Sequence, residues 1–386
     1  MLNKKLLNIA FLSTWPPRQC GLATFTQDLI EAIDAIGLVD TSVIAVNNSK
    51  GREYNSKVIY EINQNKRADY LALAQKINSS NIDLLVIEHE FGIYGGDCGE
   101  YILDLVNNLK ISVVTTFHTV LPQPNDKQKL ITKTLGEKSV KIVTMVKNTG
   151  KLLKNVYGVS PIKIEVIHHG VPVKIVPNRQ ALKDQYGYGD KQIISTFGLL
   201  SPGKGIEYAI EAISKICAVK SNILYLILGQ THPDQTDESY REKLESLVVK
   251  YHIEENVKFE NKYLTKEEII EGLQMSDIYM TPYLSKDQAV SGTLAYAIGY
   301  GRAIISTPYI YAKEMLSDGR GLLCEFKNPD SIFKCLKYIL DNPDEKKRME
   351  KNTIKLGKTM YWNIVAKCYI DMFMKTVNIN KEIGAV

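Results

Sequence analysis

Short apolar runs rich in β-branched residues alternate with segments of helical periodicity along the whole chain. In the N-terminal half, these runs predict strands over residues 7–12, 42–46, 84–87, 112–116, 142–145 and 163–167. Helical patterns lie between them, for example over residues 25–36 and 70–77. Strands that alternate with helices build parallel sheets that are covered by helices on both faces.

The alternation breaks once and then restarts. Gly170-Val171-Pro172 interrupts it, and the polar segment 177–189 reads as a linker. Further strands are predicted over residues 192–197, 223–228, 257–259, 278–280 and 303–306. We therefore expect an α/β protein with two doubly wound Rossmann-like domains, residues 1–175 and 176–358. The chain from Asp344 onward reads as helix throughout, and its last part, 359–386, is expected to cross back to the first domain.

Composition supports two domains and removes several classes of partner. The chain has 386 residues, more than one hydrophobic core usually organises. Its formal charge of +5 is too mild and too scattered to indicate a nucleic-acid partner. No apolar stretch approaches the ~20 residues of a transmembrane helix, which leaves only peripheral contact with a membrane open. Six scattered cysteines indicate reduced thiols, and we expect a cytoplasmic protein without a metal site.

In open parallel sheets, ligands bind beyond the carboxyl ends of the strands, so the loops after the strands are the places to inspect. The loop after the first predicted strand ends at Gly21, where a helix begins. The loop after strand 84–87 contains His89, Glu90 and Tyr94, and His118 follows strand 112–116. A glycine allows close backbone approach, and the polar side chains can bind hydroxyl groups. The structural alternatives are a plain turn, a structural His-Glu pair and a core histidine.

Two loops of the second half suit a phosphate group. Gly198 and Lys204 lie in a glycine-rich turn between a strand and a helix, and Ser291-Gly292-Thr293 opens a helix after a polar loop. Free N–H groups and the helix dipole favour anions at such positions. Neither a Walker loop nor a Gly-x-Gly-x-x-Gly fingerprint is present in the sequence. An exposed turn lysine and a simple serine cap are the structural alternatives.

Together these loops resemble the retaining glycosyltransferases of the GT-B fold, specifically glycosyltransferase family 4, across nearly the whole chain. The resemblance implies two Rossmann-like domains that face each other across a cleft. It places the Gly21 loop beside the donor phosphates and the acceptor, His118 near the transferred sugar, and Lys204 at the diphosphate. Residues 166–171 resemble the family's approach to its hinge, and Tyr361-Trp362 resembles the start of its C-terminal crossover.

Three positions depart from the family pattern. Leu199 stands where the family usually carries an arginine, so one expected phosphate cation is missing. Gln288 and Tyr296 replace two glutamates that normally bind the donor sugar and the ribose. A glutamine still hydrogen-bonds hydroxyl groups, but it cannot stabilise positive charge. We interpret the segment as a variant donor loop, because Ser291, Gly292 and Thr293 keep their order.

The implied activity is transfer of a sugar from a nucleotide diphosphate sugar to a hydroxyl of a carbohydrate or glycoconjugate, with retention and without a metal or cofactor. The residues expected to act in catalysis are His118, Lys204 and Gln288. The residues expected to bind the donor are Gly21, Gly198, Lys204, Gln230, Gln288, Ser291, Gly292, Thr293 and Tyr296, and those expected at the acceptor are His89, Glu90 and Tyr94.

Other activities stay open at this point. A GT-B glycoside phosphorylase or a sugar-nucleotide epimerase would share domains of this type. The altered donor loop also fits a protein that binds nucleotide sugars without turnover. A dehydrogenase is the weakest alternative, because no dinucleotide fingerprint follows the first strand of either half.

Overall fold

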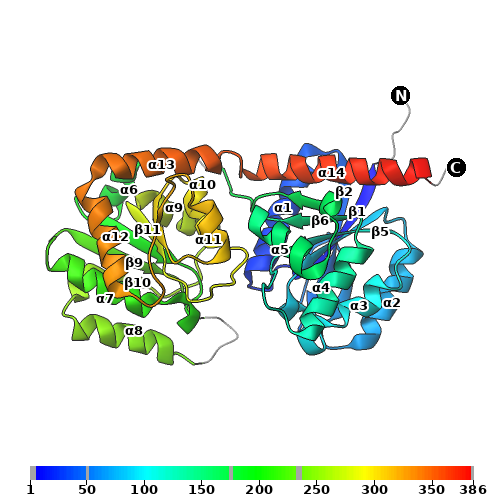
Figure 1. Ribbon diagram of the computed structural model, residues 1–386, viewed down its shortest axis with the longest axis horizontal. Helices are drawn as coiled ribbons and strands as arrows, with labels where there is room; N and C mark the ends of the chain where they lie inside the picture. Colours follow the sequence, from blue (N-terminus) through cyan, green and yellow to red (C-terminus); the bar gives the residue numbers. More distant parts are fainter. Residues whose placement is uncertain (1–5, 49–51, 174–176, 232–236, 384–386) are drawn as a thin grey trace. The chain divides into compact units, whose positions relative to one another are not determined.

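The computed structural model describes residues 6–48, 52–173, 177–231 and 237–383. The chain divides into two compact units, each built on its own parallel sheet (Figure 1). The first unit comprises Met1–Gly170 together with Trp362–Val386, and the second comprises Val171–Tyr361.

The first unit contains a seven-stranded sheet in the order β3-β2-β1-β4-β5-β6-β7. Its strands are β1 (Leu7–Ser13), β2 (Val39–Asn47), β3 (Val58–Asn63), β4 (Leu84–His89), β5 (Ser112–Phe117), β6 (Lys141–Thr144) and β7 (Ile164–Val166). Its α-helices are α1 (Gly21–Ile36), α2 (Arg67–Asn78), α3 (Ile102–Val106), α4 (Asp126–Lys138), α5 (Lys147–Tyr157) and α14 (Trp362–Ile383), and short 3₁₀ turns occupy Phe91–Ile93, Asp97–Gly99 and Pro161–Lys163.

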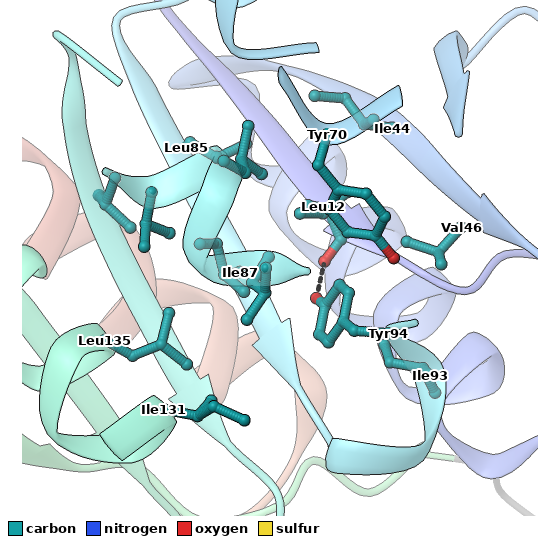
Figure 2. Close-up of a cluster of buried hydrophobic side chains, with 14 of the residues drawn as sticks. Leu12, Ile44, Val46, Tyr70, Leu85, Ile87, Ile93, Tyr94, Ile131 and Leu135 are labelled. Carbon is teal, nitrogen blue, oxygen red and sulfur yellow. Dashed lines mark hydrogen bonds between the residues drawn. The ribbon is translucent and has the colours of Figure 1, made fainter. Parts of the chain in front are cut away.

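Alternate strand residues face opposite sides of this sheet, and each side has its own helices. On one side, Leu12, Ile44, Leu85 and Ile87 belong to a buried cluster with residues of α2, α3, α4 and α5 (Figure 2). On the other side, α1 and α14 pack against each other, and Phe11 of β1 contacts Phe373 edge to face. Thus α14 completes the core of the first unit although it lies far along the chain.

Trp362 anchors the beginning of α14 on the first unit. Its ring lies 5.3 Å from that of Phe25 on α1, between centroids. A side chain at Gly170 would place its Cβ 2.0 Å from the Trp362 ring, so only glycine fits there. This contact fixes where the chain re-enters the first unit.

The second unit contains a six-stranded sheet in the order β10-β9-β8-β11-β12-β13. Its strands are β8 (Gln192–Phe197), β9 (Ile223–Leu228), β10 (Val257–Glu260), β11 (Ile278–Thr281), β12 (Ala303–Ser306) and β13 (Leu322–Leu323). Its α-helices are α6 (Arg179–Gln185), α7 (Ile206–Cys217), α8 (Ser239–Lys250), α9 (Lys266–Met275), α10 (Gly292–Gly299), α11 (Ile310–Met315), α12 (Pro329–Asp341) and α13 (Pro343–Gly357), with 3₁₀ turns at Pro202–Lys204 and Glu254–Asn256.

The same alternation buries both faces of the second sheet. Ile194, Tyr225 and Ile278 pack with residues of α7, α8 and α12 in one cluster. Helices α6, α9 and α10 lie on the other side, where α6 and α10 both contact α9 (Figure 1). Capping defines several helix starts: Asn328 caps α12, and Thr265 with Glu268 forms a reciprocal capping box on α9.

The carboxylate of Asp277, which directly precedes β11, forms ion pairs with three basic side chains. It accepts hydrogen bonds from Arg179 and Lys183 of α6, from Lys346 of α13 and from the Ile193 amide. Burial opposes its ionisation, but Lys346 and Lys183 outweigh this effect and lower the pKa of Asp277. A buried carboxylate needs such compensation, so this cluster ties α6 and α13 to the middle of the sheet.

Most strands lie where the hydrophobic pattern predicts them, but three expectations need correction. The short strands β3 and β13 were not predicted. The polar segment 177–189 is no linker, since it contains α6, which packs on α9. The continuous C-terminal helix is wrong as well, because α13 ends at Gly357 and α14 begins at Trp362. Residue 175, where the first domain was expected to end, lies outside the described residues.

His89 and Tyr94, which were expected at the acceptor, are core residues of the first unit. His89 is fully buried, and its ring packs between Phe91 and Phe117. The Tyr94 hydroxyl donates to the Glu88 carbonyl oxygen (2.9 Å) and also approaches that of Leu12 (Figure 2). Their assignment to the acceptor site is therefore wrong for this fold. His89 is the last residue of β4, which extends two residues beyond the predicted strand, and Tyr94 follows that strand; the sequence did not show that both side chains turn inward.

No helix in the described part of the chain is both long enough and apolar enough to cross a lipid bilayer.

The Asp277 cluster predicts a large difference between two acidic residues of the second unit. Asp277→Ala should lower the free energy of unfolding by about 3–5 kcal/mol, because it leaves the buried Lys183 ammonium without its carboxylate. Glu245→Ala breaks an exposed pair with Arg241 on α8 and should cost at most about 1 kcal/mol. Urea unfolding of both variants measures the difference, and equal losses would contradict this role of Asp277.

Burial of His89 predicts acid sensitivity. Desolvation, and to a lesser extent His118, lowers the pKa of His89 from 6.5 to about 3. Below pH 6.5 the His89 imidazole therefore binds a proton in the unfolded chain but stays neutral in the folded chain. The contribution of His89 to stability is fully present above pH 6.5 and falls as the pH drops toward 3. At pH 5 this loss amounts to about 2 kcal/mol.

The variant His89→Phe should remove the part of the stability loss between pH 7 and pH 5 that His89 causes. Urea unfolding at each pH measures this loss. The exposed residue His252 provides the control, and His252→Asn should retain the wild-type acid loss. Burial also lowers the pKa of His169, to about 4, so some acid sensitivity persists in both variants. A His89→Phe variant with the full wild-type loss would contradict the assignment.

Candidate functional site

The strand order places a switch point in each sheet. In the first unit the order reverses direction between β1 and β4, and in the second between β8 and β11. At such a point the loops after the two strands diverge to opposite faces and leave a crevice at the carboxyl edge. The loops singled out in the sequence follow these strands and their neighbour β5, so the topology groups the candidate residues of each unit at one sheet edge.

In the second unit, three backbone segments converge at this edge. The left-handed Gly229, after β9, lies so near Gly198, after β8, that a Cβ on it would come within 2.3 Å of the Gly198 oxygen. Gly198 is also left-handed, with φ of 128°, and a Cβ there would meet the Thr293 methyl at 3.5 Å. The Gly198 amide donates a hydrogen bond to the Leu228 carbonyl oxygen (3.0 Å). Gly198 therefore leaves room for a ligand but has no free N–H group to bind it.

Lys204 lies on a 3₁₀ turn that is held against the segment after β11. The Leu284 amide donates to the Gly203 carbonyl oxygen at 2.9 Å. Gly205 adopts a left-handed conformation, and a Cβ on it would come within 2.2 Å of the Pro282 oxygen. The Lys204 ammonium lies 4.1 Å from the centroid of the Tyr283 ring. The lysine turn and residues 282–284 therefore form one rigid element.

The amino end of α10 is organised by its own side chains. The Ser291 hydroxyl accepts from the Leu294 amide (3.3 Å) and lies 3.1 Å from the Thr293 hydroxyl. Ser291 is 4% exposed, whereas Gly292 and Thr293 are partly exposed. The Ser291 hydroxyl oxygen thus caps the helix, and its contact with the donor stays a prediction. The N–H groups of Gly292 and Thr293 precede the first helical hydrogen bonds and suit an anion.

The remaining donor-side positions differ in their accessibility. The Gln288 side chain closes its own loop by donating to the Val290 carbonyl oxygen (3.0 Å). Tyr296 is 7% exposed and lies beside Phe197 in the core. Gln230 is half-buried after β9, where its carbonyl oxygen accepts from the Leu200 amide. The two positions that replace the family's glutamates therefore contribute mainly to packing within the unit.

In the first unit, a buried carboxylate orients His118. Glu88, the residue before His89 on β4, is fully buried, and its Oε2 lies 2.8 Å from His118 Nε2. The Phe25 ring packs edge to face on the imidazole, with centroids 4.8 Å apart. A carboxylate only accepts hydrogen bonds, so this contact favours the His118 tautomer that carries a proton on Nε2. The His118 side chain is 11% exposed, so the imidazole reaches the surface at one edge.

Glu90 and Gly21 also lie at this edge of the first sheet. Glu90 caps the turn at Phe91 with Oε1 (3.0 Å) and accepts from the Thr119 hydroxyl with Oε2 (2.5 Å). Gly21 is the first residue of α1, is exposed, and would accept a Cβ with no atom within 4 Å. Packing inside the unit therefore does not require a glycine at position 21.

The structure adds two residues that sequence reasoning missed. Glu88 was placed in the loop after strand 84–87 and Tyr283 in the loop after strand 278–280, and neither was given a role at the site, whereas the structure includes Glu88 in β4. A charged residue inside an apolar strand was the available signal for Glu88. Tyr283 had no such signal, because aromatic residues after strands are common in cores. The edge of the first sheet can supply an imidazole and a carboxylate. The edge of the second sheet can supply an ammonium group and N–H groups at a helix start.

Comparison with known proteins finds relatives in sequence and in fold. The family model for Glycosyl transferases group 1 matches residues 178–356. An uncharacterized glycosyltransferase of Methanocaldococcus jannaschii, MJ1069, is 26% identical over 255 residues, which are 64% of this chain and 62% of that relative.

Two solved structures share the fold over nearly the whole chain. A glycosyltransferase from Rickettsia africae superimposes with a TM-score of 0.77 at 16% identity and covers 97% of this chain and 99% of its own. Anabaena HepE, crystallised with UDP and glucose, gives 0.76 at 13% identity, with 96% and 100% covered. The chain therefore has the GT-B fold that these glycosyltransferases share, and its second unit carries a domain that matches the glycosyl transferases group 1 family.

Proposed function

We propose that the enzyme transfers a sugar from a nucleotide diphosphate sugar to a carbohydrate or glycoconjugate hydroxyl, with retention at the anomeric carbon and without a metal. The second unit binds the donor diphosphate, and the first unit binds the acceptor side. HepE, which shares the fold, was crystallised with UDP and glucose, which supports a nucleotide-sugar donor for this chain as well.

One observation carries the proposal: positive charge gathers at the switch point of the second sheet. The Lys204 ammonium and the amino end of α10 both follow strands that border this point, β8 and β11. Departure of a nucleoside diphosphate places negative charge on its phosphate oxygens. Preorganised donors stabilise such charge more in the transition state than in the ground state, and this lowers the barrier.

In the first unit, His118 positions the reacting sugar or the acceptor hydroxyl. Glu88 holds the ring in one orientation through the 2.8 Å contact to Nε2. A retaining transfer in which the acceptor attacks on the side of the leaving diphosphate depends on the leaving group and on orientation more than on a strong base. Glu90, which is partly exposed and accepts a hydrogen bond from Thr119, the residue after His118, is the remaining acceptor candidate.

The test is a thermal-shift screen over nucleotide sugars, followed by NMR of the product formed from the stabilising donor. A ligand that binds only the folded state raises the melting temperature, so the screen identifies base and sugar together. The product should carry the donor's anomeric configuration and should form equally well in EDTA. Inversion, or loss of product in EDTA, would refute the corresponding part of the proposal.

A second candidate function is binding of nucleotide sugars without turnover. Leu199, Gln288 and Tyr296 favour it, because they replace an expected arginine and two expected glutamates. Donor binding without any transfer or hydrolysis product would support it. A phosphorylase would instead require inorganic phosphate, so product formation in phosphate-free buffer excludes that activity.

Lys204→Ala should lower kcat by about 100-fold, because it removes one preorganised donor to the leaving group. Its melting temperature should stay close to that of the wild type, since Lys204 lies on a partly exposed turn. Lys215→Ala removes a lysine that is paired with Asp330 and Glu211 on the surface of the same unit, and it should retain wild-type kcat. Unchanged kcat in Lys204→Ala would remove this lysine from the mechanism.

Gly21→Ala tests the close approach of substrate to α1. No atom of the first unit lies within 4 Å of the added methyl group, and alanine favours the helix, so stability should stay the same or rise by up to about 1 kcal/mol. The KM for donor or acceptor should rise if substrate contacts this backbone. Steady-state kinetics and thermal unfolding decide between the outcomes, and an unchanged KM would place the substrate elsewhere.

A further inference from the structure

Tyr283 lies between the two elements that are proposed to bind the diphosphate. It follows β11 and is 1% exposed. One face of its ring stacks on Tyr309, with centroids 5.7 Å apart and an angle of 16° between the planes. The Thr307 hydroxyl donates to its carbonyl oxygen. The ring therefore has one fixed position in the core of the second unit.

The Lys204 ammonium is held on this ring. Its Nζ lies 4.1 Å from the ring centroid, within the range of a favourable cation–π contact. Among the described residues, no carboxylate oxygen lies within ion-pair distance of Lys204. The lysine backbone is also fixed, through the bond from the Leu284 amide to the Gly203 oxygen.

This arrangement differs physically from a salt bridge. A carboxylate would hold the ammonium equally well, but it would cancel the charge that a phosphate needs. The face of an aromatic ring attracts a cation through its quadrupole and has no net charge. The ammonium therefore keeps its full charge and has N–H donors directed away from the ring.

The hydroxyl of the same tyrosine reaches the other element. It lies 2.8 Å from the Thr293 hydroxyl, which lies 3.1 Å from the Ser291 hydroxyl that caps α10. The chain of three hydroxyl groups joins Tyr283 to the turn that presents the N–H groups of Gly292 and Thr293. One side chain thus contacts both the ammonium and the helix end.

We propose that Tyr283 is a positioning residue: its ring holds the Lys204 ammonium without neutralising it, and its hydroxyl fixes the amino end of α10, so that both meet one diphosphate. The inference rests on the proposed function, because it takes the donor's diphosphate as the ligand. Tyr283 itself is buried and acts only through Lys204 and Thr293.

Two substitutions separate the parts of this role. Tyr283→Phe keeps the ring under the ammonium and removes the link to Thr293. Tyr283→Leu removes both contacts. Loss of a cation–π contact of ordinary strength should weaken diphosphate binding by about 3- to 30-fold, so Tyr283→Leu should bind more weakly than Tyr283→Phe.

The experiment is a double-mutant cycle with Lys204→Met on the full-length chain. Isothermal titration calorimetry measures binding of inorganic pyrophosphate, and separately of UDP, GDP, ADP and CDP, to each variant. Pyrophosphate reports on the diphosphate site whatever base the enzyme prefers. Tyr225→Leu is the control for a buried, hydrogen-bonded tyrosine of the same sheet, since Tyr225 is fully buried and contacts the Thr196 hydroxyl.

The expected result is coupling: Tyr283→Leu binds more weakly than Tyr283→Phe when Lys204 is present, and the two variants bind within about 2-fold of each other in the Lys204→Met background, where only the loss of the Thr293 link remains. Tyr225→Leu should lower the melting temperature without this coupling. If Tyr283→Leu does not fold, the comparison of Tyr283→Phe with Thr293→Val still tests the proposal, because both variants remove the same hydrogen bond. Each should weaken binding to the same extent, and the double variant should bind no more weakly than either single variant.

Two different failures can be distinguished. If the wild type binds and Lys204→Met weakens binding, but the Tyr283 variants behave as Tyr225→Leu does, the positioning role is wrong and the proposed donor site stands. If the wild type binds neither pyrophosphate nor any of the nucleoside diphosphates, the donor site and the role of Tyr283 are both wrong.

Discussion

The hydrogen-bonding pattern of parallel strands is the constraint on which the rest of this structure depends. A parallel strand must be followed by a crossover, so every chain segment leaves the sheet at the same edge, and the loops after successive strands gather there. In the second unit this brings Gly198, Lys204 and the start of α10 together from segments far apart in the sequence. In the first unit it brings together Gly21, Glu90 and His118. The reversal of strand order at β1/β4 and β8/β11 then opens space among these loops.

Close packing at these edges decides which residues are tolerated. Gly205 and Gly229 have left-handed backbones, and a Cβ on either would come within 2.3 Å of a carbonyl oxygen in a neighbouring loop. The loops are thus held against one another by backbone contacts. Such rigidity matters for catalysis, because donors that are already in place spend no energy on reorganisation when charge develops on the leaving group.

Charged side chains in this structure are compensated to different degrees. Asp277 is surrounded by three cations and joins α6 and α13 to the second sheet, which makes it a structural charge. Glu88 has a single side-chain partner, His118, whose ring reaches the surface, and its Oε1 has no partner in the described structure. Lys204 rests on an aromatic face and keeps its charge. The charge of Asp277 is fully compensated by its partners, and this residue has a role in stability. The charges of Glu88 and Lys204 are less compensated, and these residues lie at the positions proposed to act on substrate.

The sequence by itself determined the α/β class, nearly all strands and the loops that hold the candidate residues, because local hydrophobic periodicity and glycine positions carry that information. It did not determine which way a side chain turns at the end of a buried strand. His89 and Tyr94 were indistinguishable from Glu90 in the sequence, yet the first two lie in the core. The pairing of Glu88 with His118 and the contact of Tyr283 with Lys204 join residues 30 and 79 positions apart. Only tertiary structure decided these contacts, because they depend on strand order and register, which no local pattern encodes.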